Sequence, residues 1–144
     1  MGRGFEKINE LGIIPKRSTS GSAGYDFYLP ENITINPNEI KVVDTYIKAY
    51  MENDEFLAIF IRSSMGIKKG LRVVNSVGII DSDYYNNPEN GGHIKIALKN
   101  ESSETINLEA GERIAQGIFL KYLTVDNDAA TNIRQGGIGS TDKK

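Results

Sequence analysis

Two carboxylates, Asp81 and Asp83, follow the apolar run Gly78-Ile79-Ile80 and are separated by a single residue. Successive side chains of a β-strand point to opposite faces, so residues two positions apart lie on one face. We therefore expect both carboxylates on the same side of a strand. Paired carboxylates can orient a water molecule, bind a metal ion or share a proton. The alternative is a polar strand end before the Asn-rich turn at residues 86–92, and these residues alone leave both open.

The segment Arg62-Ser63-Ser64 has the side chains of a phosphate-binding site, because it combines a guanidinium with two hydroxyls. Residues 63–70 predict a short helix with a Ser cap and with Gly70 as its end. The N-terminus of such a helix would point backbone N–H groups outward beside Arg62, where they could bind an anion. The alternative is a capped helix preceded by a solvated arginine.

Near the C-terminus, Arg134 precedes the run Gly136-Gly137-Ile138-Gly139-Ser140-Thr141. The N–H groups of a glycine-rich loop can surround oxyanions, although a P-loop would need a Lys after its final Gly. The alternative is a frayed terminus. Two weaker signals are Asp26, which follows a Ser- and Gly-rich run, and the pair Arg113 and Gln116 near the start of an expected strand.

Composition limits the classes of protein to which the chain can belong. Its 144 residues fit one domain with a real core. A net charge of −2, from 17 basic and 19 acidic residues, argues against binding of long nucleic acids, which needs a cationic face. There is no Cys for a disulfide or a thiolate. Because no signal peptide or membrane span is recognisable, we expect a soluble, cytoplasmic protein without membrane contact.

The elements that would position these groups are predicted to be short strands. Residues 94–99 alternate Ile or Leu with Lys or Ala, which is typical of a half-buried strand. Residues 40–51, 56–61 and 114–125 are rich in β-branched and aromatic residues and predict further strands. Turn residues separate them, at positions 36–38, 52–54, 86–92 and 109–112. The pattern predicts an all-β single domain, a sandwich or barrel with one short helix.

Taken together and in this order, the segments resemble the five motifs of the homotrimeric dUTP pyrophosphatase (dUTPase) family. Ala23-Gly24-Tyr25-Asp26-Phe27 is similar to its AG-x-D-L motif and Ile61-Arg62-Ser63-Ser64-Met65 to its PRS-[GS]-L motif. The family pattern N-x5-D-x-D-Y is present from Asn75 to Tyr84. Arg113-Ile114-Ala115-Gln116 matches the fourth motif, and the tail resembles the fifth, RG-x-GGFGS.

The resemblance implies a fold, an assembly and a reaction. The fold would be a jelly-roll-like barrel or sandwich over residues 1–132, with a mobile C-terminal arm at residues 133–144. Three copies would form a trimer in which each active site is shared between chains. The reaction would be magnesium-dependent hydrolysis of dUTP to dUMP and pyrophosphate, which keeps uracil out of DNA and supplies dUMP for thymidylate synthesis.

The resemblance also implies roles for individual residues. Asp81 would be the base that deprotonates the water attacking the α-phosphorus, and Asp26 would contact Mg²⁺ through water. Asn75 would bind the uracil edge in a β-hairpin pocket, and Tyr84 would lie against the deoxyribose and exclude UTP. The remaining substrate-binding residues would be Gly78, Ile79, Ile80 and Lys95 near the base, Arg62, Ser63, Ser64 and Gln116 at the α- and β-phosphates, and Arg134, Ile138, Gly139, Ser140 and Thr141 in the arm.

This sequence departs from the family pattern in four respects. Ile61 replaces the Pro of the second motif, and Ile138 stands where the family has Phe. Arg134 is one residue closer to that position than usual. After Tyr84, the loop at residues 86–92 delays the next strand until about His93. We expect His93, the only histidine, to be a solvated loop residue without a catalytic role.

Two other functions fit parts of the pattern. A dCTP deaminase has a similar fold, but its chemistry needs a Glu where this chain has Ala97. A trimeric regulator that only binds a nucleotide would be compatible with the altered tail, but it would have no need of the base at Asp81.

Overall fold

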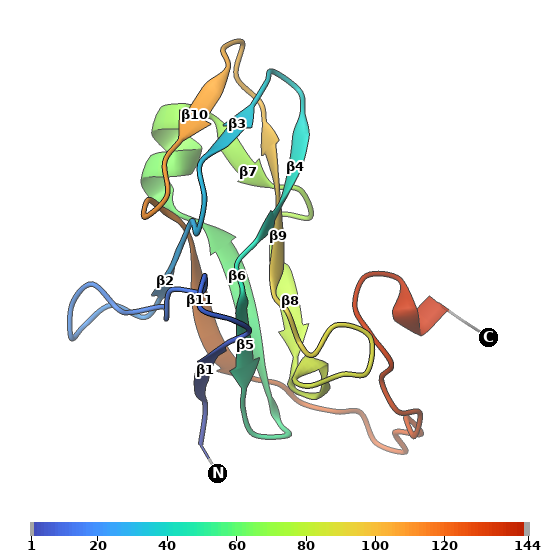
Figure 1. Cartoon of the computed structure of the whole chain (residues 1–144). Helices are drawn as coiled ribbons and strands as arrows, with labels where there is room; N and C mark the ends of the chain where they lie inside the picture. The colour runs from blue at the N-terminus through green and yellow to red at the C-terminus, as the bar shows by residue number, and fades with distance from the viewer. Residues whose placement is uncertain (1, 143–144) are drawn as a thin grey trace.

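A computed structural model describes residues 2–142, in which eleven strands and three short helical turns follow one another along the chain (Figure 1). The helical turns are η1 (Ser64–Lys68), η2 (Ser82–Tyr84) and η3 (Ser140–Asp142). The strands are β1 (Gly4–Lys7), β2 (Tyr25–Tyr28), β3 (Ile33–Ile35), β4 (Ile40–Asp44), β5 (Ile47–Tyr50), β6 (Glu55–Ile61), β7 (Leu71–Val73), β8 (Gly78–Asp81), β9 (Lys95–Asn100), β10 (Ile106–Leu108) and β11 (Arg113–Lys121). The prediction of a protein made mostly of strands is confirmed.

The strands form four open sheets whose pairs are all antiparallel. The largest has the order β2-β11-β6-β8, and a second has the order β4-β9-β7. Two strand pairs, β1-β5 and β10-β3, complete the set. One hydrophobic cluster draws side chains from all of these sheets, so the described chain has a single core. Within residues 2–142, no helix has the length and apolar character needed to span a membrane.

The predicted strand at residues 94–99 is confirmed with a shift of one residue, as β9. Ile96 and Leu98 are buried, whereas Lys95 is exposed, as the alternation predicts. Ile94 is also fully buried although it precedes the strand. The prediction at residues 56–61 is likewise confirmed by β6, which begins at Glu55.

The single strand predicted at residues 40–51 is wrong, because the chain divides there into β4 and β5. Tyr46, between them, has a φ of +56°, in the left-handed region that interrupts an extended strand. β4 pairs with β9 and β5 with β1, so the break transfers the chain from one sheet to another. The hydrophobic pattern did not show it, since apolar and aromatic residues continue on both sides of Tyr46.

The strand predicted at residues 114–125 ends earlier, at Lys121 of β11. Leu123 and Val125 are exposed, at 96% and 75%, so they contribute nothing to the core of this chain. From there the chain continues without regular structure until η3. It returns beside η2 and the loop at residues 86–92, where it forms the arm drawn in red in Figure 1.

The predicted helix at residues 63–70 is only the five-residue π-helical turn η1. Ser63 already has helical backbone angles and makes no side-chain capping bond, so the prediction of a Ser cap is wrong. The stop at Gly70 is confirmed, because its φ of +75° lies in the region that glycine adopts without strain.

Strand β8 lies at the edge of the largest sheet and pairs with β6 alone among the described strands. The preceding strand, β7, belongs to the other sheet and pairs with β9. Because β7 and β8 do not pair with each other, the prediction of a β-hairpin around the base pocket is wrong. Instead, residues 74–77 connect two sheets, and the space between their edges is lined by residues of both.

A candidate active site in two halves

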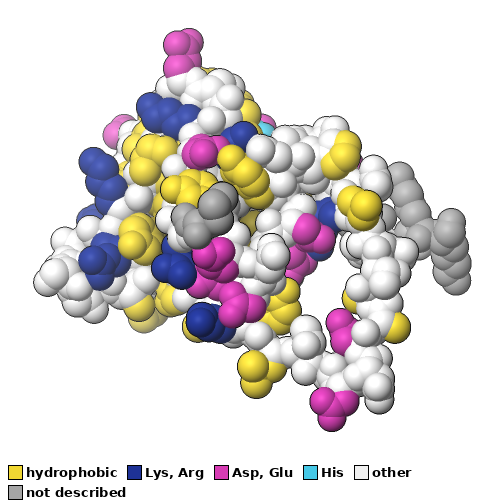
Figure 2. Space-filling view, turned by 90° about the horizontal axis from the view of Figure 1, so that it is seen from below, with side chains coloured by type: hydrophobic (Ala, Val, Ile, Leu, Met, Phe, Trp, Pro, Cys, Tyr) yellow, Lys and Arg dark blue, Asp and Glu magenta, His cyan; other side chains and the backbone are white. Residues whose placement is uncertain are grey.

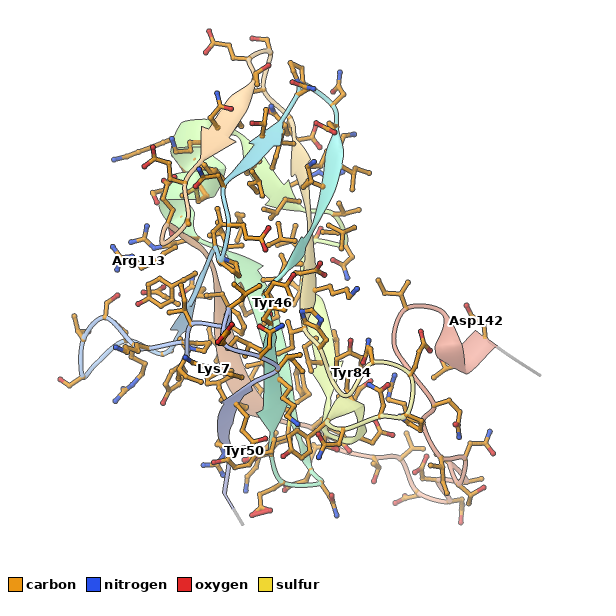
Figure 3. The ribbon with its side chains drawn as sticks, viewed as in Figure 1. Lys7, Tyr46, Tyr50, Tyr84, Arg113 and Asp142 are labelled. Atoms are coloured by element: carbon orange, nitrogen blue, oxygen red, sulfur yellow. The ribbon has the colours of Figure 1, made fainter. Side chains whose placement is uncertain are left out.

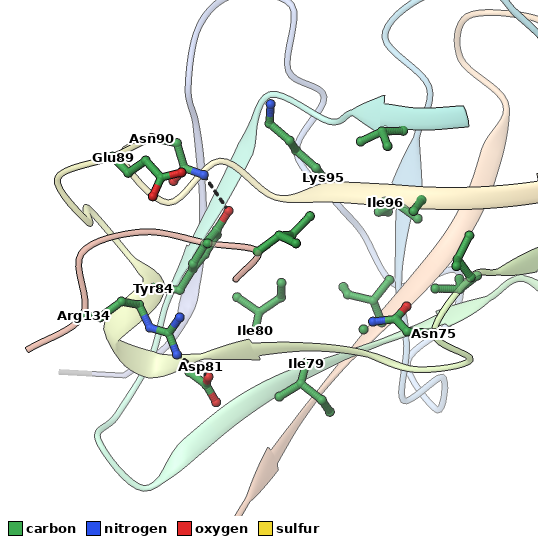
Figure 4. Close-up of a pocket in the computed structure, with 18 residues that line it drawn as sticks. Asn75, Ile79, Ile80, Asp81, Tyr84, Glu89, Asn90, Lys95, Ile96 and Arg134 are labelled. Atoms are coloured by element: carbon green, nitrogen blue, oxygen red, sulfur yellow. Dashed lines mark hydrogen bonds and ion pairs between the residues drawn. The ribbon is translucent and has the colours of Figure 1, made fainter. Parts of the chain in front are cut away.

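A cavity of about 530 Å³ lies between β8 and β9 (Figure 4). β8 contributes Gly78, Ile79, Ile80 and Asp81, and Asn75 reaches it from the connection at residues 74–77. Its other lining residues are Val42, Ile59, Val73, Val74, Tyr84, Glu89, Asn90, Lys95, Ile96, Ala97, Arg134, Gly137 and Ile138. The residues assigned to base, sugar and catalysis from the sequence are thus brought together, and the cavity is mainly apolar with polar groups at its rim, as a small-molecule site requires.

Three features of β8 make it suited to bind a planar polar ring. Its outer edge pairs with no described strand, which leaves outward-facing backbone N–H and C=O groups able to bond a ligand. Gly78 lies directly against Ile59, because a Cβ on Gly78 would be 3.2 Å from the Ile59 Cβ. Ile79 is half exposed at the pocket, whereas Ile80 packs against the core.

Asp81 and Asp83 both contact Arg134. The Asp81 Oδ2 accepts a hydrogen bond from Arg134 Nη2 at 2.6 Å, and Asp83 Oδ1 accepts one from Arg134 Nε at 2.6 Å. The two carboxylates do not share a strand face as predicted, since β8 ends at Asp81 and Asp83 lies in η2. One guanidinium brings them together instead.

The arm covers the mouth of this cavity. Arg134, whose side chain is only 16% exposed, also donates from Nη1 to the Gly136 carbonyl at 3.1 Å. The Glu89 N–H donates to the Gln135 carbonyl at 2.9 Å, which joins the arm to the 86–92 loop. Gly137 lies so close to the Tyr84 ring that a Cβ there would be 3.1 Å from Cε1. The arm therefore rests on the cavity of its own chain.

Of the other predicted arm residues, Gly139 accepts a hydrogen bond at its carbonyl from the Asp142 N–H at 3.2 Å. Ile138 is 92% exposed although it borders the cavity, and Thr141 is exposed. Gly139 has a φ of +76°, which glycine adopts readily. The backbone of Ser140 lies in η3, and its side chain is outside the described part of the chain, as are residues 143–144.

Lys95 lines the cavity, but its ammonium is directed to Asp44. Its Nζ is 3.4 Å from Asp44 Oδ1, across the paired strands β4 and β9. Both side chains are partly exposed, so this ion pair contributes little to stability. A ligand could compete for the ammonium.

The second pocket, of about 310 Å³, gathers the predicted phosphate ligands and Asp26. Arg62, Ser63 and Ser64 follow the end of β6, and Gln116 comes from the neighbouring β11. Ser18, Ser22, Gly24 and Asp26 complete the lining. Cationic, hydroxyl and carboxamide donors thus meet in one place, which is what an anion needs.

Some of the backbone N–H groups expected to bind an anion beside Arg62 already donate hydrogen bonds within the protein. The N–H groups of Met65 and Gly66 donate to the Arg62 carbonyl, at 2.9 and 3.0 Å. The Arg62 Nη1 donates to the Ser64 hydroxyl at 2.9 Å. In this half, side chains rather than a helix terminus are the principal donors.

Asp26, 6% exposed, organises the arginines around this pocket. Its Oδ1 is 3.9 Å from Arg62 Nε, and its Oδ2 is 3.4 Å from Arg113 Nη1. The Ser18 hydroxyl donates to Oδ2 at 2.8 Å. A nearly buried carboxylate needs such partners, and in return it holds both guanidiniums beside the pocket.

Gly24 explains why the first motif requires glycine. A Cβ at this position would be 2.4 Å from the Gln116 Oε1 and 3.0 Å from its Cβ. The absence of a side chain therefore leaves space for the Gln116 carboxamide, which lies beside Asp26 in the pairing of β11 with β2.

The two pockets lie far apart on one chain. Asp81 pairs with Phe56 of β6, and Arg62 follows Phe56 by six residues. At about 3.3 Å per residue, the two ends of β6 are on the order of 20 Å apart. Figure 3 shows Arg113 and Tyr84 at opposite sides of the body. Figure 2 shows acidic, basic and hydrophobic side chains interspersed on the face seen from below, without a dominant charge.

His93 lies in the loop before β9, as predicted, but it is only partly exposed and therefore not fully solvated. Its Nε2 accepts a hydrogen bond from the Tyr46 N–H at 2.9 Å, and its ring lies 5.0 Å from the Tyr46 ring. Desolvation lowers the pKa of His93, with a smaller lowering from Lys95 and an opposing effect of Asp44. The neutral ring therefore stabilises the break between β4 and β5.

Sequence reasoning missed several residues that border the two pockets. Asn90 and Glu89 come from the loop that departs from the family pattern, and Ser18 and Ser22 come from the run before Asp26. Arg113 was placed in a motif, but its contact with Asp26 was not foreseen. For Asn90 and Glu89, the sequence signal that could have indicated a place beside the pocket was the position of their loop directly after Tyr84.

Comparison with known proteins places these features in context. A family model described as dUTPase matches residues 10–142. The deoxyuridine 5'-triphosphate nucleotidohydrolase of Lactococcus lactis subsp. lactis (strain IL1403) is 48% identical over 145 residues, which cover 96% of this chain and 97% of that protein. The crystal structure of the dUTPase from Streptococcus mutans shares 48% identity, with a TM-score of 0.81 over 86% of this chain and 99% of the other.

A more distant structure shows the fold alone. It is a mutant dUTPase from phage phi11 of S. aureus that coordinates a structural Mg(II) ion. It is 18% identical to this chain, with a TM-score of 0.76 over 92% of this chain and 99% of its own.

Proposed function

Since this chain belongs to the dUTPase family, we propose that its two pockets are the two halves of one dUTP site. The chain is a dUTP diphosphatase, which hydrolyses dUTP to dUMP and pyrophosphate. The proposal concerns which residues carry each part of this reaction, how many copies of the chain a site requires, and what the arm does.

The uracil would enter the cavity beside β8. The Asn75 carboxamide offers a donor and an acceptor to the base edge, and the free outer edge of β8 adds backbone groups of Ile79 and Ile80. The close packing of Gly78 on Ile59 brings this edge near the ring. Lys95 lies on the facing strand, where it could be released from Asp44.

Tyr84 would bind the deoxyribose. Its ring borders the cavity next to Asp81, and a 2′-hydroxyl would collide with it. Asp81 would then lie by the sugar and the α-phosphorus, where its carboxylate can accept a proton from the attacking water. Arg134 occupies Oδ2 of Asp81 in this structure, so movement of Arg134 towards the triphosphate would free that oxygen.

The phosphates would be bound in the second pocket by Arg62, Ser63, Ser64 and Gln116. Phosphoryl transfer depends mainly on positioning and on neutralisation of charge, and these groups supply both. Asp26 fits an indirect contact with Mg²⁺, since that ion keeps several waters and binds through one or two carboxylates together with substrate phosphates. Residues 2–142 contain no cluster of three or more His, Asp or Glu side chains to hold a metal alone. When bound, Mg²⁺ would neutralise phosphate charge.

The separation of the two halves is the observation that supports the proposal of a site shared between chains. A general base must lie within hydrogen-bond reach of the reacting group, yet Asp81 and Arg62 are separated by the length of β6, about 20 Å. A triphosphate is shorter than this distance. We therefore propose that three jelly-roll-like copies assemble so that the Asp81 half of one chain meets the Arg62 half of another.

The arm at residues 133–144 would act as a separate unit from the β-domain at residues 1–132. Arg134 and the glycine-rich run would close over the γ-phosphate and base, with Ile138, Gly139, Ser140 and Thr141 as contacts. Residues 122–132, which are exposed and have no regular structure, would also let the arm reach a neighbouring chain. We propose that the enzyme works in the cytoplasm, where its nucleotide substrate occurs.

Mixed assemblies test the shared site. Asp81→Asn and Arg62→Ala chains, each nearly inactive alone, are unfolded together, refolded as a mixture and assayed for pyrophosphate release from dUTP with magnesium. We expect the mixture to recover a substantial part of wild-type activity, because some interfaces then combine two intact halves. Two Asp81→Asn preparations refolded together are the control. A mixture as inactive as its parents would mean that each chain carries a whole site.

A further inference from the structure

The hydroxyl of Tyr84 is held by two hydrogen bonds from outside the strands. It donates to the His93 carbonyl at 2.5 Å and accepts from Asn90 Nδ2 at 2.9 Å (Figure 4 shows the latter as a dashed line). We propose that Asn90 is a positioning residue for sugar selection, which acts by fixing the Tyr84 ring. The inference rests on the proposed role of Tyr84 against the deoxyribose.

The orientation of the Asn90 carboxamide follows from its partners. Its Oδ1 accepts hydrogen bonds from Asn87 Nδ2 at 2.8 Å and from the Gly92 N–H at 3.0 Å. Both partners are donors, so the atom facing them must be oxygen. Asn90 Nδ2 therefore faces the Tyr84 hydroxyl, whose own proton is directed to His93. Both polar atoms of the Asn90 carboxamide and the Tyr84 hydroxyl oxygen therefore have a hydrogen-bond partner of the complementary kind.

Asn87 in turn fixes Asn90. Its side chain is only 5% exposed, and its Nδ2 also donates to the Tyr84 carbonyl at 2.7 Å. Its Oδ1 accepts from the N–H groups of Glu89 and Asn90, at 3.0 and 3.1 Å. The buried carboxamide thus joins the start of the loop, its tip and η2 into one network, and such networks rigidify the groups they contain.

The backbone of the loop permits little movement. Gly91 and Gly92 have φ values of +72° and +95°, and a Cβ on Gly92 would be 2.9 Å from the Asn86 nitrogen. Lys48 of β5 anchors the loop from outside, because its Nζ donates to Asn86 Oδ1 at 2.6 Å. The 86–92 loop is therefore a rigid support behind Tyr84.

A fixed ring discriminates better than a mobile one. A 2′-hydroxyl can be accommodated only if the Tyr84 ring moves, and movement would break the bonds to Asn90 and His93. Removing one hydrogen bond of ordinary net strength changes an equilibrium by about fivefold. The loop after Tyr84 thus increases selectivity for dUTP over UTP without touching either nucleotide.

The test compares kcat/KM for dUTP and UTP in five variants, of which Tyr84→Ala removes the ring and tests the premise. Asn90→Ala is expected to lower the dUTP/UTP ratio about fivefold or more, mainly through a higher kcat/KM for UTP. Tyr84→Phe, which removes the hydroxyl and leaves the loop contacts of Asn87 intact, is expected to lower it similarly. The double variant should show no further loss, because both changes break the same link. Lys48→Met is the matched control: it removes the contact of Lys48 with Asn86 but no hydrogen bond of the Tyr84 hydroxyl, so it should lower the ratio much less than Asn90→Ala does.

The possible results distinguish a failure of the positioning role of Asn90 from a failure of the proposed sugar role of Tyr84. If Tyr84→Ala lowers the ratio but Asn90→Ala and Tyr84→Phe do not, the sugar role stands and the positioning role is wrong. Equal losses in Asn90→Ala and Lys48→Met would also overturn it, since the cause would be general loosening. If Tyr84→Ala leaves the ratio unchanged, both the premise and the inference fall. Thermal unfolding of each variant verifies that it is folded, and Tyr84→Phe carries the test if Asn90→Ala does not fold.

Discussion

At the residue scale, Asp81 combines a half-exposed carboxylate with a position at the end of an edge strand. Asp81→Asn keeps the shape and can still accept from Arg134, but it cannot take a proton. We expect turnover to fall by about 10²–10⁴-fold, with little loss of affinity for a non-hydrolysable dUTP analogue. Steady-state kinetics and calorimetric titration measure the two quantities. Turnover near that of the wild type would mean that another group is the base.

His93 gives a prediction for pH dependence. Burial lowers its pKa in the folded chain, so the unfolded chain binds more protons below the usual value of about 6.5. Stability from the neutral ring is therefore complete above about pH 6.5 and is lost as the pH falls through that value towards the lowered pKa. The melting temperature should decrease on acidification. His93→Gln, which can still accept from the Tyr46 N–H but does not titrate, should show a shallower decrease, and an unchanged slope would contradict the assignment.

At the element scale, the arm contacts residues at the cavity, and it has few contacts that would stabilise the fold. Its residues are mostly exposed, and its bonds run to Asp81, Asp83 and Glu89 rather than to the core. Deletion of residues 133–144 should leave the melting temperature and the assembly nearly unchanged while hydrolysis collapses. Size-exclusion chromatography and kinetics on the truncated protein measure both. Full activity would mean that the arm is only a frayed terminus.

Ile138 offers a test in which activity improves. It is 92% exposed at the cavity, and an aliphatic side chain cannot stack on a base as an aromatic ring does. Base–aromatic stacking contributes about 1–3 kcal/mol in nucleic-acid complexes. Ile138→Phe should therefore lower KM for dUTP and protect the arm from protease when an analogue is bound. An unchanged KM together with unchanged protease sensitivity would show that the arm does not contact the base.

At the scale of the whole molecule, the distance between the pockets makes activity depend on association. We expect sedimentation to give three times the chain mass of 15.9 kDa. Specific activity should fall when the protein is diluted below the concentration at which it assembles, because a lone chain has two incomplete halves. Activity that is independent of concentration in a preparation shown to be monomeric would contradict the shared site.

Much of this protein was determined locally and was therefore predictable from its sequence. The alternation in β9, the glycine that ends η1 and the order of the motif residues depend on neighbours in the chain, and they correctly indicated strands, a stop and the family. The residues assigned to the base and sugar do line one cavity, and those assigned to the α- and β-phosphates line another. Their assigned contacts with dUTP remain predictions.

Tertiary structure decided what depends on partners distant in sequence. At the break, the Tyr46 N–H donates to His93, 47 residues away, and the pairing of Arg134 with Asp81 spans 53 residues. The separation of the pockets follows from the register of β6 with β8, which no local pattern specifies. Asn90 reaches the Tyr84 hydroxyl only because the loop folds back on η2. Side-chain type and periodicity indicate which groups are available, whereas strand pairing and loop closure determine which of them meet.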